Sequence, residues 1–125
     1  MITRTKQFAL RTMKLVGALP KTVQGRSIAT QLMRSGTSVA ANYRAACRAR
    51  SKAEFIAKLG TVEEEADESA FWLELIVEGG LLTEKLVRPL LIEASELVAI
   101  TASSKKTDSS GLARSQIANR KSAFL

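Results

Sequence analysis

Apolar side chains recur at intervals of three and four residues through most of the chain, and strict alternation of apolar and polar residues is absent. This spacing puts the apolar residues on one face of an α-helix. Only two prolines and seven glycines occur among 125 residues, which disfavours a turn-rich β fold. Aromatic residues make up 5%, so aliphatic side chains and alanine must fill the core. The pattern predicts an all-α protein.

Four amphipathic helices are expected. The first ends at Leu19, because the residue before Pro20 is disfavoured in the helical region. The second begins near Ser27 and contains Gly36, which predicts either a close approach of another helix or a bend. The residues expected to face the core are Phe8, Thr12, Leu15 and Leu19; Ile28, Leu32, Val39, Tyr43 and Ala46; Phe55, Leu59, Val62, Ala66, Ala70, Leu73 and Val77; and Leu86, Leu90, Ala94, Leu97 and Thr101.

Start and stop signals bound the last two helices. The sequence Ser51-Lys52-Ala53-Glu54 fits a capping box, and Gly79-Gly80 ends the helix that follows it. The fourth helix is expected from about Thr83, with a kink or a later start caused by Pro89. Short loops between four helices predict an antiparallel up-down-up-down four-helix bundle over residues 1–104. Residues 105–125 are polar, basic and rich in serine, and are expected to form a flexible, disordered tail.

The net charge of +7 is unevenly distributed along the chain. Residues 1–60 hold 12 basic residues and one acidic residue, a net charge of +11. Residues 61–100 hold two basic and ten acidic residues, a net charge of −8, and residues 101–125 carry +4. Basic and acidic helices could neutralise one another side by side, or the basic face could stay exposed and contact phosphate. Charge alone favours the first interpretation.

Enzymatic chemistry finds little support in the sequence. The chain has no histidine, which excludes Ser/His/Asp triads, Cys/His pairs and histidine metal sites. The run Glu63-Glu64-Glu65-Ala66-Asp67-Glu68 lacks the histidines of a di-iron bundle, and is expected to be a solvated or salt-bridged face. We therefore expect no catalytic residue, metal or cofactor. Cys47, the single cysteine, suits a reducing cytoplasm, and no stretch is long and apolar enough to cross a membrane.

Two sets of residues are candidates for binding. The helical phase puts several arginines opposite the core stripe of the second helix, where they could contact phosphate largely independently of sequence. The nucleic-acid-binding candidates are Arg26, Arg34, Arg44 and Arg48, followed by Arg11, Lys14, Arg50 and Lys52. The third helix is apolar nearly all round at its end, so either several helices or a neighbouring subunit must cover it. The candidates for a subunit interface there are Phe71, Trp72, Leu75 and Ile76.

Several strings in the sequence carry a resemblance to a known family. They are Leu19-Pro20-Lys21, the stretch 31–43 (QLMRSGTSVAANY), the stretch 51–59 (SKAEFIAKL), the stretch 64–68 (EEADE) and Trp72-Leu73-Glu74-Leu75. Over residues 8–104 the chain resembles the small four-helix-bundle proteins encoded within intervening sequences of bacterial 23S ribosomal RNA genes. That family includes the accessory variability proteins of diversity-generating retroelements. Many relatives carry an acid three residues after the motif Asn42, where this chain has Ala45.

The resemblance implies a non-enzymatic bundle that assembles as a ring-like homopentamer. For the retroelement members it implies binding of RNA or DNA and of a reverse transcriptase through basic surface. Two functions follow as hypotheses. The first is an oligomeric nucleic-acid-binding or ribonucleoprotein accessory protein. The alternative is a protein–protein scaffold or adaptor whose charged faces serve only subunit assembly.

Overall fold

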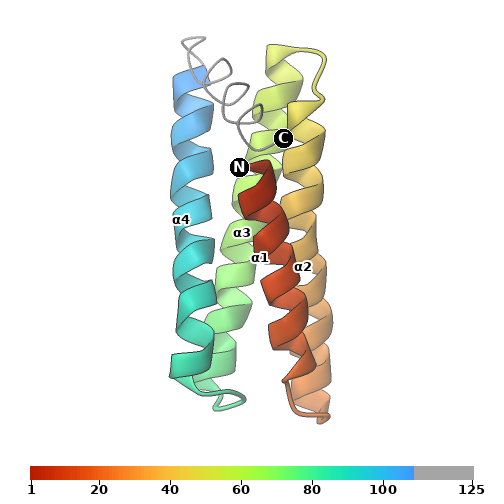
Figure 1. The fold of residues 1–125 in the computed structure, drawn as a ribbon, viewed down its shortest axis with the longest axis vertical. Coiled ribbons are helices and arrows are strands. Elements are labelled where there is room, and N and C mark those ends of the chain that lie inside the picture. The colour runs from red at the N-terminus through yellow and green to blue at the C-terminus, as the bar shows by residue number, and fades with distance from the viewer. Residues whose placement is uncertain (109–125) are drawn as a thin grey trace.

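A computed structural model describes residues 1–108 of the chain, and these form four antiparallel helices (Figure 1). They are α1 (Ile2–Gly17), α2 (Val23–Cys47), α3 (Lys52–Glu78) and α4 (Glu84–Asp108). Sequential helices are neighbours, and α1 packs closely on α2 but only lightly on α4. The predicted all-α, up-down-up-down bundle is confirmed. No helix within residues 1–108 is long and apolar enough to span a bilayer.

The helix boundaries agree with the local signals at most ends. Ser51 caps α3, its Oγ accepting the backbone N–H of Glu54 at 3.0 Å, and Gly80 turns the chain after α3 with φ of +69°. The predicted start of α2 near Ser27 is wrong. The helix begins at Val23, four residues before Ser27. Thr22 caps it there, since the Thr22 hydroxyl accepts the backbone N–H of Gly25.

Two expectations for α4 also need correction. The helix begins at Glu84 and includes Pro89, so the proline does not delay its start. It also continues to Asp108, so residues 105–108 are its last turn and not part of a tail. The rest of the expected tail, residues 109–125, lies outside the described residues.

The core lies along the predicted stripes, except that Ile28 is only partly buried and that neighbouring residues are exchanged at two places. Leu86, expected to face the core, is 53% exposed, and Val87 is buried in its place. On α3, Ile76 is fully buried whereas Val77 is partly buried. The fully buried large side chains include Phe8, Leu32, Val39, Phe55, Leu59, Val62, Leu73 and Leu97.

Small and polar residues set how closely the helices approach. A Cβ atom at Gly36 would lie 2.6 Å from Thr12 Cγ2, so the glycine allows α1 and α2 to pack in close contact. The Ser69 hydroxyl of α3 donates to the Ser35 hydroxyl of α2 at 2.9 Å inside the core. These contacts fix α2 between α1 and α3, and therefore fix which of its faces points outward.

Candidate functional site

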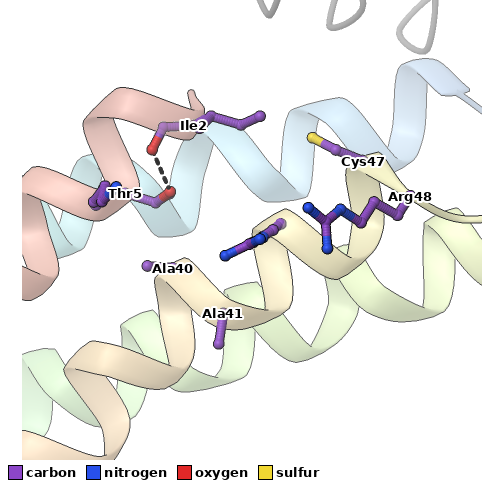
Figure 2. A pocket seen from close by; sticks show the side chains of 8 residues that line it. Ile2, Thr5, Ala40, Ala41, Cys47 and Arg48 are labelled. Atoms are coloured by element: carbon purple, nitrogen blue, oxygen red, sulfur yellow. Dashed lines mark hydrogen bonds between the residues drawn. The ribbon is translucent and has the colours of Figure 1, made fainter.

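A groove between the first two helices, here called the α1/α2 groove, has a volume of about 520 Å³. Figure 2 shows Ile2 and Thr5 on α1, Ala40, Ala41 and Cys47 on α2, and Arg48 directly after the end of α2. Lys6 and Arg44 complete the lining. Five of the eight lining residues are uncharged and three are cations. The groove thus combines small or aliphatic side chains with positive charge.

The helical phase of α2 explains why two of these cations are together. Arg48 is the C-cap residue of α2 and follows Arg44 by four residues, so the two cations lie together at the end of the helix. Like charges at this spacing repel each other unless an anion lies between them. Lys6 approaches from α1 across the groove. All three residues are exposed, and none takes part in the ion pairs found within residues 1–108.

The sequence around the groove contains no carboxylate. The first acidic residue of the chain is Glu54, so neither α1 nor α2 can supply a counter-ion. The positive potential at the groove is therefore not neutralised by its own two helices. An arrangement of this kind can bind phosphate groups electrostatically.

Arg34 has a different environment from the other arginines of α2. Its guanidinium donates to Glu65 Oε2 at 3.2 Å and to the carboxylate of Glu68, both on α3. Trp72 Nε1 also donates to Glu68, at 3.1 Å. The Trp72 hydrogen bond and the Arg34 guanidinium hold the pKa of Glu68 below its usual value, and the contacts with Glu68 and Glu65 raise the pKa of Arg34. Arg34 is thus a link between α2 and α3.

The other protein residues predicted to bind nucleic acid lie in three separate places. Arg26 is exposed five helical turns before Arg44, so it shares that face but lies about 27 Å away along the axis. Arg11 and Lys14 are on α1 and line a separate groove against α4. Arg50 is in the loop between α2 and α3, and Lys52 is the first residue of α3. Of the eight predicted residues, the structure brings only Arg44 and Arg48 together at the α1/α2 groove.

Lys6 is the member of the groove that sequence reasoning missed. Its one signal is its place in an acid-free N-terminal helix. Knowing that it faces α2 requires the packing of Thr12 against Gly36, which the helical pattern alone does not determine.

The predicted subunit-interface residues also fall into two groups. Ile76 is fully buried inside its own bundle, so its side chain cannot meet another subunit, which corrects that assignment. Phe71 is 49% exposed and contacts Trp72 edge-on, with ring centroids 5.1 Å apart. Trp72 and Leu75 are partly buried beside it. This leaves an aromatic patch on the outer side of α3.

No group of three or more acidic, cysteine or histidine side chains within residues 1–108 is arranged to hold a metal ion. The acidic run of α3 instead supplies ion pairs to its neighbours. Glu65 and Glu68 bind Arg34, and Glu63 pairs with Lys105 of α4 at 2.8 Å.

Comparisons were made with curated proteins, with solved structures and with models of protein families. No curated protein matches the sequence. A crystal structure of a protein of unknown function from the S23 ribosomal protein family of Bacteroides thetaiotaomicron is similar, with 31% identity and a TM-score of 0.75. The match covers 82% of this chain and 94% of that chain. The model of the 23S rRNA-intervening sequence protein family matches residues 1–103. That match spans nearly the whole bundle, and the chain belongs to the 23S rRNA-intervening sequence protein family.

Proposed function

We propose that this chain is a non-enzymatic nucleic-acid-binding protein that contacts phosphate through the α1/α2 groove. The observation that carries the proposal is the cluster of Lys6, Arg44 and Arg48 around a groove whose two helices contain no carboxylate. The description of the family refers to 23S rRNA, which favours RNA as the first probe. A cytoplasmic location and a role as accessory to a ribonucleoprotein or a reverse transcriptase belong to the same proposal.

The contact is expected to be with the backbone and to carry little sequence information. The groove has no aromatic side chain on which a base could stack. Arg44 and Arg48 on one side and Lys6 on the other can reach phosphate oxygens on a strand lying along the groove. Binding of this kind weakens steeply as salt rises, because the release of counterions from the nucleic acid is then less favourable.

The test is the salt dependence of binding to single-stranded RNA, duplex RNA and duplex DNA of mixed sequence. The double variant Arg44→Ala/Arg48→Ala should bind more weakly at low salt and show a shallower salt slope. On duplex DNA the slope should fall by up to about 0.9 for each phosphate that the variant no longer neutralises. The matched control is Lys85→Ala/Arg88→Ala, which removes the same charge from α4 and should change binding less.

Two outcomes would rule the proposal out. One is the absence of binding to any of the three probes at low salt. The other is an equal loss of affinity in the groove variant and the α4 control, because net charge alone would then explain the binding.

Self-assembly is a second candidate role, favoured by the exposure of Phe71. A half-exposed phenylalanine beside Trp72 and among acidic residues is more typical of an interface than of a solvated helix. We include in this proposal the homo-oligomer, a pentamer by resemblance, and the scaffold or adaptor role. Solution mass measured at low and high salt tests it. A monomer of 13.5 kDa at every concentration would contradict it.

A further inference from the structure

A second groove lies between α1 and α4, and we call it the α1/α4 groove. Its volume is about 360 Å³, near the lower end of the range of about 300–1,000 Å³ that is usual for small-molecule sites. Because α1 packs only lightly on α4, the two helices leave this space between them. On α1 the lining runs from Arg11 to Ala18, a length of about 10 Å. The groove is therefore of a size for a small, elongated ligand.

Most of the lining is aliphatic. Its apolar members are Leu15, Ala18, Leu86, Pro89 and Leu90. Leu15 and Leu90 are buried, whereas Leu86 is 53% exposed. A ligand that covers Leu86 removes apolar surface from water, which is favourable in proportion to the area. Since the lining has no aromatic side chain on which a base could stack, it favours a hydrocarbon chain over a nucleotide.

The other two members of the lining are cations. Arg11 and Lys14 are three residues apart on α1, so their side chains are neighbours and can reach one anionic group. Both are exposed, and neither takes part in the ion pairs found within residues 1–108. Glu93 of α4 interacts electrostatically with Arg11, but it already accepts two hydrogen bonds from Arg4, at 2.7 and 2.8 Å. The positive charge at the groove is therefore left for an anion from outside the chain.

We propose that the α1/α4 groove binds an aliphatic carboxylate, a small acid with an unbranched hydrocarbon chain. The chain would lie against Leu15, Leu86 and Leu90, and the carboxylate would be bound by Arg11 and Lys14. A guanidinium offers paired N–H donors that match the two oxygens of a carboxylate, and an ammonium adds a compact charge. The two grooves share no lining residue, so this inference depends neither on nucleic-acid binding nor on self-assembly.

Equilibrium dialysis of the full-length protein at pH 7 against octanoate, decanoate and dodecanoate tests the site, each acid below its critical micelle concentration. Each further methylene that reaches the groove should tighten binding by up to about fourfold, the gain expected from burying one CH₂. Acetate keeps the charge without the chain, and 1-decanol keeps the chain without the charge. Each should bind at least about tenfold more weakly than decanoate.

The cationic end has its own pair of variants. Arg11→Ala/Lys14→Ala should weaken decanoate binding by about tenfold or more and leave 1-decanol binding unchanged, because only the acid uses the two cations. The matched control is Arg44→Ala/Arg48→Ala, which removes the same charge from the α1/α2 groove and should bind decanoate like the wild type.

The apolar wall is tested at Leu86. Leu86→Asp should weaken the binding of both decanoate and 1-decanol, since it replaces apolar lining with a charge. Ile92→Asp is the matched control, because Ile92 is also on α4, is 51% exposed and lines neither groove. Far-UV circular dichroism should show unchanged helicity in all variants, since the altered side chains are exposed.

Three outcomes would overturn the site. The first is the absence of binding to all three acids. The second is an equal loss of decanoate binding in the two double variants, because attraction by net charge would then explain it. The third is binding to vesicles of anionic phospholipid without binding to decanoate, since the ligand would then be a lipid surface. None of them bears on the nucleic-acid proposal, which is measured with RNA and DNA.

Discussion

Gly36 and Thr12 meet where α1 packs on α2, so closely that a Cβ atom at Gly36 would lie 2.6 Å from Thr12 Cγ2 and 2.8 Å from its Oγ1. Thr12 cannot turn away easily, because it is fully buried and its hydroxyl donates to the carbonyl of Phe8 at 2.8 Å. Gly36→Ala should therefore destabilise the bundle by about 1–2 kcal/mol, the overpacking cost exceeding the gain in helix propensity. Urea unfolding measures the change.

Gly60 is the matched control for that substitution. It is also inside a helix, but a Cβ atom there would meet only Lys105 Nζ, at 4.0 Å. Gly60→Ala should stabilise the protein by up to about 1 kcal/mol through helix propensity. Equal effects of the two substitutions would show that the contact with Thr12 does not limit the approach of the helices.

Arg4 and Glu93 should make the stability depend on pH. Arg4 donates to both carboxylate oxygens of Glu93, at 2.7 and 2.8 Å, and this contact lowers the pKa of Glu93 from its usual value. The stabilisation is present above the unfolded pKa and is lost as the pH falls through the lower folded pKa. Arg4→Gln should cost about 1 kcal/mol near pH 7, and its difference from the wild type should shrink below about pH 4.5.

The control for Arg4 is Arg88→Gln. Arg88 pairs with Glu84 one turn away on the exposed side of α4, so its loss should cost at most about 0.5 kcal/mol. A gap between Arg4→Gln and the wild type that stays constant from pH 7 to pH 3 would contradict the assigned role of Glu93.

Trp72 should report the protonation of Glu68. It is the only tryptophan, and its Nε1 donates to the Glu68 carboxylate. Its fluorescence should change as the pH falls, with a midpoint below that of an ordinary glutamate, because the Trp72 hydrogen bond and Arg34 lower the pKa of Glu68. In Arg34→Ala the midpoint should move up, and in Glu68→Gln the transition should vanish. The comparison uses the pH range in which far-UV circular dichroism stays constant.

Arg34 and Arg44 should differ in their effect on nucleic-acid binding. Both are exposed arginines of α2, but Arg34 is engaged by Glu65 and Glu68 on α3. Phosphate would have to displace these carboxylates, so Arg34→Ala should reduce RNA affinity less than Arg44→Ala does. Affinities measured for both variants at one low salt concentration test this. An equal or larger loss in Arg34→Ala would show that its ion pairs do not compete with phosphate.

Local signals in the sequence are enough to predict the fold. The capping box at Ser51, the glycines after α3 and the apolar spacing each act through neighbours within a few residues, and the structure agrees with them. The start of α2 is harder to predict because Thr22 and Ser27 are both acceptable caps. The phase of α4 is ambiguous because Leu86 and Val87 are both apolar, and tertiary packing decides that Val87 is the buried one.

The candidate site is less predictable, because it depends on which helices meet. Arg34 and Arg44 both lie off the core stripe in the sequence, yet one faces α3 and the other faces the α1/α2 groove. Lys6 joins the groove only through the packing of α1 on α2. Contacts between helices far apart in the sequence are set by tertiary packing, which a periodic pattern does not encode.

The long-range ion pairs have a consequence for synthesis on the ribosome. Arg4 is made 89 residues before its partner Glu93, and Arg34 is made 31 residues before Glu65. Because residues 1–53 contain no acid, the nascent first hairpin emerges as a polycation with no internal counter-ion. The acidic partners of Arg34 and Arg4 are made only with α3 and then α4, so these ion pairs form after the first hairpin has been synthesised.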